Sequence, residues 1–367
     1  MSSPIETLAD DAIGLLEDLI GIPSFSEEES AVADRIQSFL SDRNISVNRH
    51  YNNLWAFSEN FSPEKPTILL NSHHDTVRPN EGWEHDPFTP VRENDRLYGL
   101  GSNDAGGPLV SLIAVFLSLQ GEQLLPYNLV LALTAEEEIS GEHGISSVVS
   151  EFGKIDLAIV GEPSGMRMGI AERGALVLEC RAAGRSGHAA RNEGENAIEK
   201  ALDDIQWVRS YQFPESSGVL GDVKMTVTMI SAGTQHNVIP DSCKFTLDVR
   251  VPDTYRNDEV LEIIRKHLHS EVIPVTTELT ASRLPDGHPL FQAADNAGIT
   301  TFVSPTSSDQ GLLDIPSVKI GPGESERSHT ADEYIKMSEI RDGIGTYLNL
   351  LRELRPVADK LAKVHWR

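Results

Sequence analysis

Three consecutive glutamates, Glu136 to Glu138, end an apolar segment of this sequence and could take part in metal chemistry. A run of charges is usually a solvated surface, because buried carboxylates repel one another and lose their hydration. A bound cation would remove both costs. The surrounding sequence must therefore show whether other metal-binding side chains accompany this run.

Further histidines and carboxylates follow other apolar segments. With the glutamates they make five groups, which are His73 to Asp75, Asp104, Glu136 to Glu138, Glu162 and His329. The carboxyl ends of parallel strands lie at one edge of a sheet, where the active sites of α/β proteins form. Solvation does not explain five such groups at one edge, so the sequence predicts a metal site there.

The spacing within these groups predicts how they are used. In an extended strand, residues two apart point to the same side, so His73 and Asp75 should face the site and His74 should point away. Asp75 can then accept a hydrogen bond from the His73 ring nitrogen that does not bind metal. Asp104, in the glycine-rich segment GLGSNDAGG, suits a bridge between two ions about 3.5–4 Å apart. Imidazole and oxygen ligands without thiolate suit zinc, cobalt or manganese.

The composition restricts the partners and the location of the protein. A formal net charge of −25 over 367 residues makes nucleic acid and anionic membrane surfaces poor partners. Cys180 and Cys243 form no Cys-x-x-Cys pair, so any metal must use histidine and carboxylate ligands. Acidic residues interrupt the apolar N-terminal segment, which indicates an amphipathic helix, and no apolar run is long enough to span a bilayer. We therefore expect a cytoplasmic protein.

Short apolar strands that alternate with helices are expected to position the five groups. Candidate strands are residues 67–72, 128–134, 156–160 and 317–321. This pattern predicts an α/β fold with a mostly parallel sheet covered by helices, formed by residues 1–172 and 283–367. Between them, the order β-α-β-β-α-β predicts an inserted ferredoxin-like domain over residues 173–282.

Motifs of several other enzyme classes are missing from the sequence. The segments GLGSND and GPGESE have neither the G-x-G-x-x-G nor the P-loop spacing. No G-x-S-x-G and no H-E-x-x-H occurs. The sequence therefore supports neither a serine triad nor a single-zinc protease helix.

Several motifs together resemble the co-catalytic metallopeptidase and deacylase family that contains acetylornithine deacetylase, succinyl-diaminopimelate desuccinylase, aminoacylase and carboxypeptidase G. They follow the family's order and are SHHDTV, WEHDPF, LYGLGSND, TAEEE, VGEPS, GRSGHAA, NEGENAI, HNVIP, LDVR and SHTADEY. The resemblance implies that His73 and Glu162 hold one ion, that Glu138 and His329 hold the other, and that Asp104 bridges them.

The resemblance also implies roles for residues that bind no metal. Asp75 would orient His73, and Glu137 would be the general base. In the inserted domain, which is similar to the family's dimerisation lid, His188 would reach the partner subunit's site and steady the oxyanion. Asn237 and Arg250 would lie near the substrate.

Four positions in three motifs depart from the usual pattern of the family. Glu136 replaces an aspartate at the start of the glutamate triplet, so the sequence also allows a register shifted by one residue. His74 replaces a small residue or threonine, and Ala105 and Gly106 replace the Met-Lys pair that usually follows the bridging aspartate.

The activity implied by the resemblance is hydrolysis of the amide bond of an N-acyl amino acid. N-acetylornithine, converted to ornithine and acetate in arginine biosynthesis, is the first choice, with two zinc or cobalt ions as cofactors and a homodimer formed through the inserted domain. Alternatives are a succinyl-diaminopimelate desuccinylase, an acylcitrulline or succinylornithine deacylase, and a dipeptidase or carboxypeptidase. A non-catalytic metal-binding scaffold is a different class, and Glu137 argues against it because a scaffold needs no free carboxylate beside the ions. The excess of acidic over basic residues favours a substrate with a free amine, such as ornithine.

Overall fold

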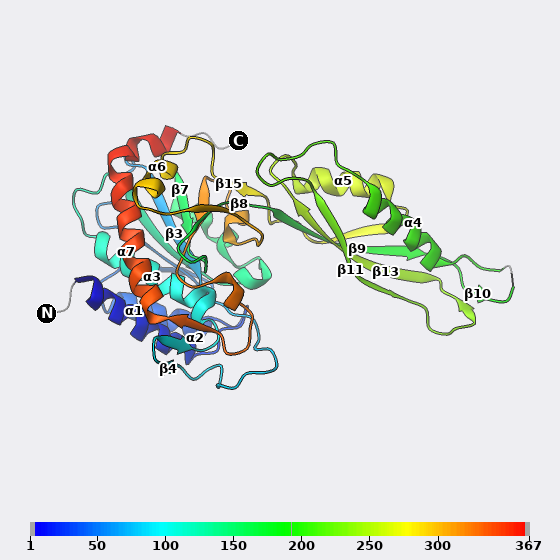
Figure 1. The fold of residues 1–367 in the computed structure, drawn as a ribbon, viewed down its shortest axis with the longest axis horizontal. Coiled ribbons are helices and arrows are strands. Elements are labelled where there is room, and N and C mark those ends of the chain that lie inside the picture. The colour runs from blue at the N-terminus through cyan, green and yellow to red at the C-terminus, as the bar shows by residue number, and fades with distance from the viewer. Residues whose placement is uncertain (1–3, 192, 364–367) are drawn as a thin grey trace. The chain divides into compact units, whose positions relative to one another are not determined.

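The computed structural model describes residues 4–191 and 193–363, which divide into two compact units (Figure 1). Unit 2 contains Ala171–Ser282 and Val303–Ser307, and unit 1 contains the rest. Sequence analysis placed the inserted domain at residues 173–282 and did not assign residues 303–307 to it. These residues begin with the last two residues of the strand β16 (Thr301–Ser304), which pairs with β8 (Met168–Glu172), so the chain returns to unit 2 for one short segment.

Unit 1 is organised by a sheet whose four central strands are parallel. In spatial order these are β6 (Asn128–Thr134), β3 (Thr67–His73), β7 (Leu157–Val160) and β17 (Ser317–Lys319). The strands β1 (Asn48–His50) and β2 (Asn53–Phe57) flank β6, and β8 and β15 (Ser282–Arg283) flank β17. Every residue of the four central strands is buried. The prediction of a mostly parallel sheet is confirmed.

Alternating side chains of this sheet enter two separate cores. One face packs against helices α1 (Pro4–Ile20), α2 (Ser30–Ser41), α3 (Gly107–Leu119), α6 (Pro289–Asn296) and α7 (Met337–Leu354) (Figure 1). The other face packs against the short helices η3 (Ile145–Ser147) and η4 (Val149–Phe152). Among the described residues, the window Ser102–Leu119 alone has the length and hydropathy of a membrane span, and 78% of it is buried, as in a core helix.

Shorter elements complete unit 1. The strands β4 (Val91–Glu93), β5 (Arg96–Tyr98) and β18 (Tyr334–Lys336) form a small sheet. The short helices are η1 (Ser102–Gly106), η2 (Glu137–Ile139), η5 (Asp309–Leu312), η6 (Ser325–Arg327) and η7 (Arg355–Lys363). Three of them, η1, η2 and η5, carry acidic residues that recur in the site described below.

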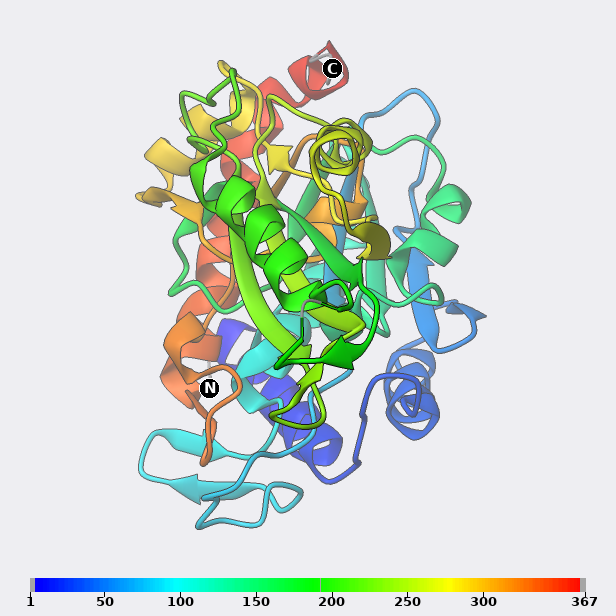
Figure 2. The same ribbon diagram turned by 90° about the vertical axis from the view of Figure 1, so that its right-hand side faces the viewer.

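Unit 2 has the predicted β-α-β-β-α-β order. Its elements are β9 (Gly174–Ala183), α4 (Ala197–Ser210), β11 (Lys224–Ala232), β13 (Ser242–Val251), α5 (Asn257–His267) and β14 (Glu271–Thr276). The sheet order is β11-β13-β9-β14 with antiparallel neighbours, and both helices pack against one face of it (Figure 2). A separate pair, β10 (Gly187–His188) and β12 (Val238–Ile239), projects the motif that contains His188.

One local expectation was wrong. The spacing of Ser26 and Glu29 predicts a capping box, but α2 begins at Ser30 and Glu29 occupies the N-cap without a side-chain cap hydrogen bond. The Ser26 hydroxyl instead donates to Asp75 Oδ2 at 2.7 Å. The serine therefore stabilises a carboxylate of the site rather than the start of a helix.

Candidate metal centre

His73 is the last residue of β3 and lies at the centre of the site. Its side chain is 1% exposed, and its Nδ1 atom lies 3.1 Å from the carbonyl oxygen and 3.3 Å from the carboxylate Oδ1 of Asp75. Its Nε2 atom is buried and makes no hydrogen bond to any described residue. A buried ring nitrogen without a hydrogen bond is costly, whereas a neutral imidazole held through its other nitrogen is the usual form of a metal ligand.

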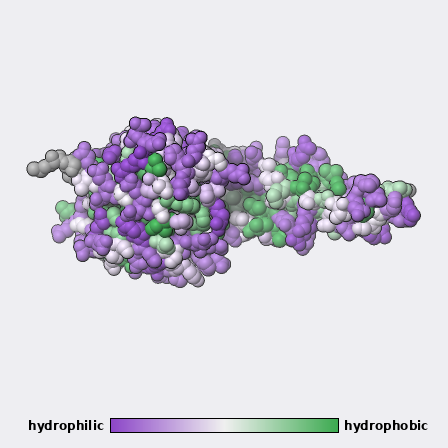
Figure 3. All heavy atoms as spheres, turned by 90° about the horizontal axis from the view of Figure 1, so that it is seen from below, coloured by the Kyte–Doolittle hydropathy of each residue, from purple (hydrophilic) through white to green (hydrophobic). Residues whose placement is uncertain are grey.

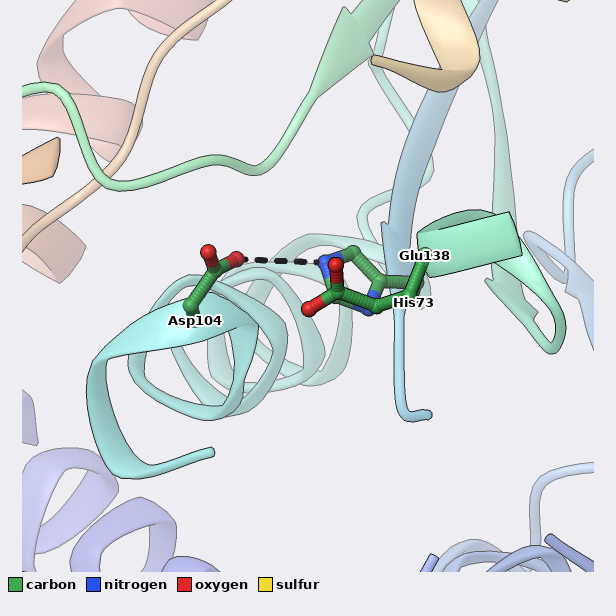
Figure 4. Close-up of side chains that lie close together, drawn as sticks. All are labelled: His73, Asp104 and Glu138. Atoms are coloured by element: carbon green, nitrogen blue, oxygen red, sulfur yellow. Dashed lines mark ion pairs between the residues drawn. The ribbon is translucent and has the colours of Figure 1, made fainter. Parts of the chain in front are cut away.

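Asp104 presents one carboxylate oxygen to each of two histidines. Its Oδ1 atom lies 3.3 Å from His73 Nε2, and its Oδ2 atom lies 3.7 Å from His329 Nε2. The same His329 nitrogen lies 3.0 Å from Glu138 Oε2. Figure 4 shows Asp104 and Glu138 directed toward the His73 ring. This is the arrangement that a carboxylate bridging two cations requires.

Glu137 and Glu162 approach His73 from the ends of the neighbouring strands. Glu137 Oε2 and Glu162 Oε1 each lie 3.8 Å from His73 Nε2, and Glu162 Oε1 is buried without a hydrogen-bond partner among the described residues. Two overlapping groups result, one of His73, Asp104 and Glu138 and one of His73, Glu137 and Glu162, each with ligand atoms within 4.8 Å of one another. Nitrogen and oxygen donors that converge with unsatisfied atoms fit divalent ions.

The three glutamates do not share one environment. Glu136 turns away from the site, and its Oε2 atom accepts the backbone N–H of His143 at 3.0 Å. The backbone N–H groups of Glu137 and Glu138 each donate to the Asp75 carboxylate at 3.1 Å. Asp75 therefore fixes the glutamate turn as well as the His73 ring, and this arrangement supports the register in which Glu137 and Glu138 face the site.

The electrostatics show how strongly the site favours cations. Burial lowers the pKa of the His73 imidazole, but the surrounding carboxylates, led by Glu137, raise it well above its usual range. Burial raises the pKa of Glu162 to about 8, with His73 opposing the shift, and raises the pKa of Glu137 well above its usual range. The hydrogen bond that His329 Nε2 donates to the Glu138 carboxylate raises the pKa of His329 to about 9. Without ions, protons bound at Glu137 and Glu162 would reduce the repulsion between these carboxylates.

His74 points away from the site, as the alternation of strand residues predicts. Its Nε2 atom lies 3.0 Å from the carbonyl oxygen of Asn52, and burial lowers the pKa of its imidazole to about 4. The residue that departs from the family's usual small side chain therefore packs behind the ligands rather than among them.

Two buried acids near the site were not identified from the sequence. Asp309, in η5, is 2% exposed and accepts the hydroxyl of Thr134, the last residue of β6, at 2.8 Å. Glu333 is also 2% exposed and accepts backbone N–H groups of the Asp104 loop. Glu333 belongs to the motif SHTADEY, so that motif offered a signal, whereas the segment of Asp309 offered none.

The three remaining site residues from the sequence belong to unit 2. His188 and Asn237 are exposed; His188 ends β10 and Asn237 directly precedes β12, and the N–H of Ala189 donates to the Asn237 carbonyl oxygen at 3.0 Å. Arg250, on β13, donates from Nε and Nη2 to Asp248 at 2.8 and 2.9 Å. The structure thus places His188 beside Asn237, and it holds the fork of Arg250 on a neighbouring carboxylate.

Comparison with known proteins places the chain in a peptidase family. The sequence pattern described as Peptidase family M20/M25/M40 matches residues 69–353, and the chain belongs to this family. The family assignment makes the protein an enzyme and agrees with the resemblance noted from its motifs.

Three curated relatives align with most of the chain. The LysW-lysine/LysW-ornithine hydrolase of Saccharolobus solfataricus is 26% identical and covers 93% of this chain and 95% of its own. An acetylornithine deacetylase of Buchnera aphidicola is 24% identical over 88% of this chain and 93% of its own. The succinyl-diaminopimelate desuccinylase 2 of a Ruegeria species is 23% identical over 96% of this chain and 97% of its own.

Solved structures share the fold at lower sequence identity. The M20 metallo-carboxypeptidase Sso-CP2 of Sulfolobus solfataricus has a TM-score of 0.75 and 18% identity, covering 97% of this chain and 100% of its own. The YXEP protein of Bacillus subtilis, described as a dinuclear metal-binding peptidase, has a TM-score of 0.71 and 15% identity, covering 96% and 99%.

Proposed function

We propose that this protein hydrolyses the amide bond of an N-acyl amino acid with two divalent ions, zinc by preference and cobalt as a substitute. One observation carries the proposal. The buried Nε2 atom of His73, which has no hydrogen bond to a described residue, lies where two groups of carboxylates meet. His73 and Glu162 would hold one ion, Glu138 and His329 the other, and Asp104 would bridge them.

The residues of the chain divide the chemical work. The bound ions supply a polarised amide carbonyl and a water of lowered pKa. Asp75 keeps the His73 ring in the tautomer whose Nε2 atom is free to bind metal. Glu137 takes a proton from the attacking water at its carboxylate and later delivers it to the departing nitrogen, so no covalent enzyme intermediate is needed. His188 donates a hydrogen bond to the developing oxyanion, a contribution of a few kcal/mol in comparable sites.

The substrate that we propose is N-acetylornithine. The three relatives described above are named for substrates that contain ornithine, lysine or diaminopimelate, all of which carry two amino groups. A net charge of −25 favours a substrate whose side chain keeps a free amine. Arg250 is assigned to the substrate carboxylate through Nη1, because its Nε and Nη2 atoms already donate to Asp248, which orients the guanidinium group.

A hydrolysis panel tests the activity and the substrate together. Protein loaded with zinc or cobalt is assayed with acetylornithine, succinyl-diaminopimelate, succinylornithine, acetylcitrulline and dipeptides, and a chelated sample serves as the control. We expect the highest kcat/KM with acetylornithine and no activity after chelation. If kcat/KM is more than about tenfold higher for succinyl-diaminopimelate, a difference of roughly 1.4 kcal/mol, the assignment to acetylornithine is wrong. Two bound ions without any hydrolysis would favour the scaffold.

We also propose a cytoplasmic homodimer formed through unit 2. The strand β11 is an edge of its sheet, and Met229 and Ile230 on it are 66% and 55% exposed. Figure 3 shows apolar side chains at the surface of unit 2. An exposed apolar edge strand is suited to pair with a second copy. Both cysteines are buried and unpaired, which agrees with a reducing compartment.

A further inference from the structure

Glu333 holds the loop that carries Asp104. Its Oε1 atom accepts the backbone N–H groups of Asn103 at 2.8 Å and of Asp104 at 2.9 Å, and its Oε2 atom accepts that of Gly101 at 3.1 Å. Its own carbonyl oxygen accepts the N–H of Gly99 at 3.0 Å. One residue thus accepts four N–H groups from six consecutive positions of this loop.

The loop needs such a partner because its backbone is irregular. Asp104 has φ −118° and ψ 99°, which are not helical values, and Gly101 has a positive φ of 73°. Backbone N–H groups in such a segment have no regular helical acceptor, and burying them unpaired is costly. Burial, the largest cause, and the charge of Asp104 raise the pKa of the Glu333 carboxyl to about 8, and the three N–H groups oppose this shift.

The segment that supplies this anchor also supplies a candidate metal ligand. His329 lies four positions before Glu333, and Asn103 is tied to the same region through Glu324, whose N–H donates to Asn103 Oδ1 at 3.1 Å. Glu333 itself belongs to neither group of converging ligand atoms, because its oxygens are directed to backbone N–H groups. The position of Asp104 relative to His329 is therefore set by contacts between the Asp104 loop and the segment 324–333.

We propose that Glu333 is a positioning residue that fixes the backbone of Asp104, so that both oxygens of this carboxylate are shared between two ions. The proposal rests on the two-ion function proposed above. If the anchor is removed, Asp104 can still bind one ion through either oxygen. It can no longer hold its oxygens toward His73 and His329 at the same time, so binding of the second ion weakens.

The test compares Glu333→Gln and Glu333→Ala with Asp332→Asn as a matched control. Asp332 is the preceding residue and accepts the N–H groups of Glu84 and His85, both at 3.0 Å, in a loop without candidate ligands. Bound zinc is measured by elemental analysis and calorimetry, and magnetic coupling between two manganese ions is measured by electron paramagnetic resonance. Thermal unfolding of the metal-free proteins checks that each variant folds.

We expect the Glu333 variants to change the affinity for the second ion and not for the first. Both Glu333 variants should bind the first ion as wild type does and the second at least about tenfold more weakly, with loss of the coupled manganese signal. If Glu333→Ala fails to fold, Glu333→Gln carries the test, since it keeps the size of the side chain and an acceptor oxygen. The control should bind both ions normally.

Three results would overturn the inference. One is second-ion affinity within about twofold of wild type in the Glu333 variants, with the manganese signal still coupled, which leaves the proposed function intact. Another is an equal loss in Asp332→Asn, which would indicate general loosening of the segment. The third is wild-type protein that binds fewer than two ions, which would remove the proposed function as well.

Discussion

The polar residues of the site are held in opposite ways in the two units. In unit 1, His73, Glu137 and Glu162 are largely buried at the ends of parallel strands, and burial and neighbouring charges shift their pKa values strongly. In unit 2, His188 and Asn237 are exposed at a short strand pair. The candidate ligands of unit 1 therefore converge in the protein alone, whereas the site residues that we propose in unit 2 are exposed and would need substrate or a second subunit to surround them.

The largest effect is expected from Glu137, since the contrast within the glutamate triplet is sharp. Glu137→Gln should keep both ions but lose at least about a hundredfold in kcat, because the amide cannot take the proton. Glu136→Gln is the matched control, because its carboxylate accepts the His143 N–H outside the site, and it should lose no more than a few-fold. Steady-state kinetics with elemental analysis of both variants decides the matter. If Glu136→Gln is inactive but still binds both ions, Glu136 rather than Glu137 is the general base.

A mixing experiment tests whether unit 2 acts across a dimer. His188→Ala should lose roughly a hundredfold in kcat, as expected for an oxyanion donor. Mixing it with Glu137→Gln should restore part of the activity, because one site of each heterodimer then has both residues intact. Activity is followed after the two variants are mixed and exchanged, with each variant alone as the control. A fully active wild-type monomer at assay concentration would contradict completion of the site by a second subunit.

Metal affinity should rise with pH, because the neighbouring carboxylates of unit 1 raise the pKa of a histidine that must lose its proton to bind an ion. The hydrogen bond with Glu138 raises the His329 pKa to about 9, so the metal-free imidazole is protonated at neutral pH and must lose its proton to bind an ion. Affinity should increase about tenfold per pH unit between pH 7 and 9 for this proton alone. Calorimetry in buffers of different ionisation enthalpy measures the released protons. An affinity independent of pH in this window would contradict the assignment of His329.

The smallest effect concerns Arg250, whose guanidinium group donates two hydrogen bonds to Asp248. Asp248 accepts two hydrogen bonds from Arg250, so Asp248→Asn should loosen the guanidinium without removing it. Both side chains are partly exposed, so the expected result is a rise in KM of only a few-fold with kcat unchanged. Asp241→Asn, which removes an exposed hydrogen bond to Ser186, is the control. A fall in kcat without a change in KM would place Arg250 in the chemical step.

The sequence was most informative where ligands follow strands. A strand has a period of two, so the opposite directions of His73 and His74 could be predicted, as could the common edge of the sheet at which the ligands meet. Strand propensity and apolar composition similarly located the four central strands and the β-α-β-β-α-β order of unit 2.

Long-range contacts of irregular segments could not be predicted. Glu333 binds the N–H of Asp104 across 229 residues, and neither segment has a periodic pattern that indicates a partner. Ser26 has the spacing of a helix cap, yet a distant carboxylate competes for its hydroxyl. The contact between Asp248 and Arg250 could have been predicted, because residues two apart on a strand share a face.

The insertion of unit 2 between β8 and β15 determines the order in which the centre is synthesised. The ribosome completes His73, Asp104, Glu138 and Glu162 before unit 2 begins, and His329 only after unit 2 and a further segment are finished. At roughly 5–20 residues per second, the nascent chain carries an incomplete ligand set for on the order of 10 s. Unit 2 has a separate hydrophobic core, so it can fold during this interval. If these residues bind zinc as proposed, an ion captured early would be held by a partial site, and full retention would begin only when the last part of unit 1 leaves the ribosome.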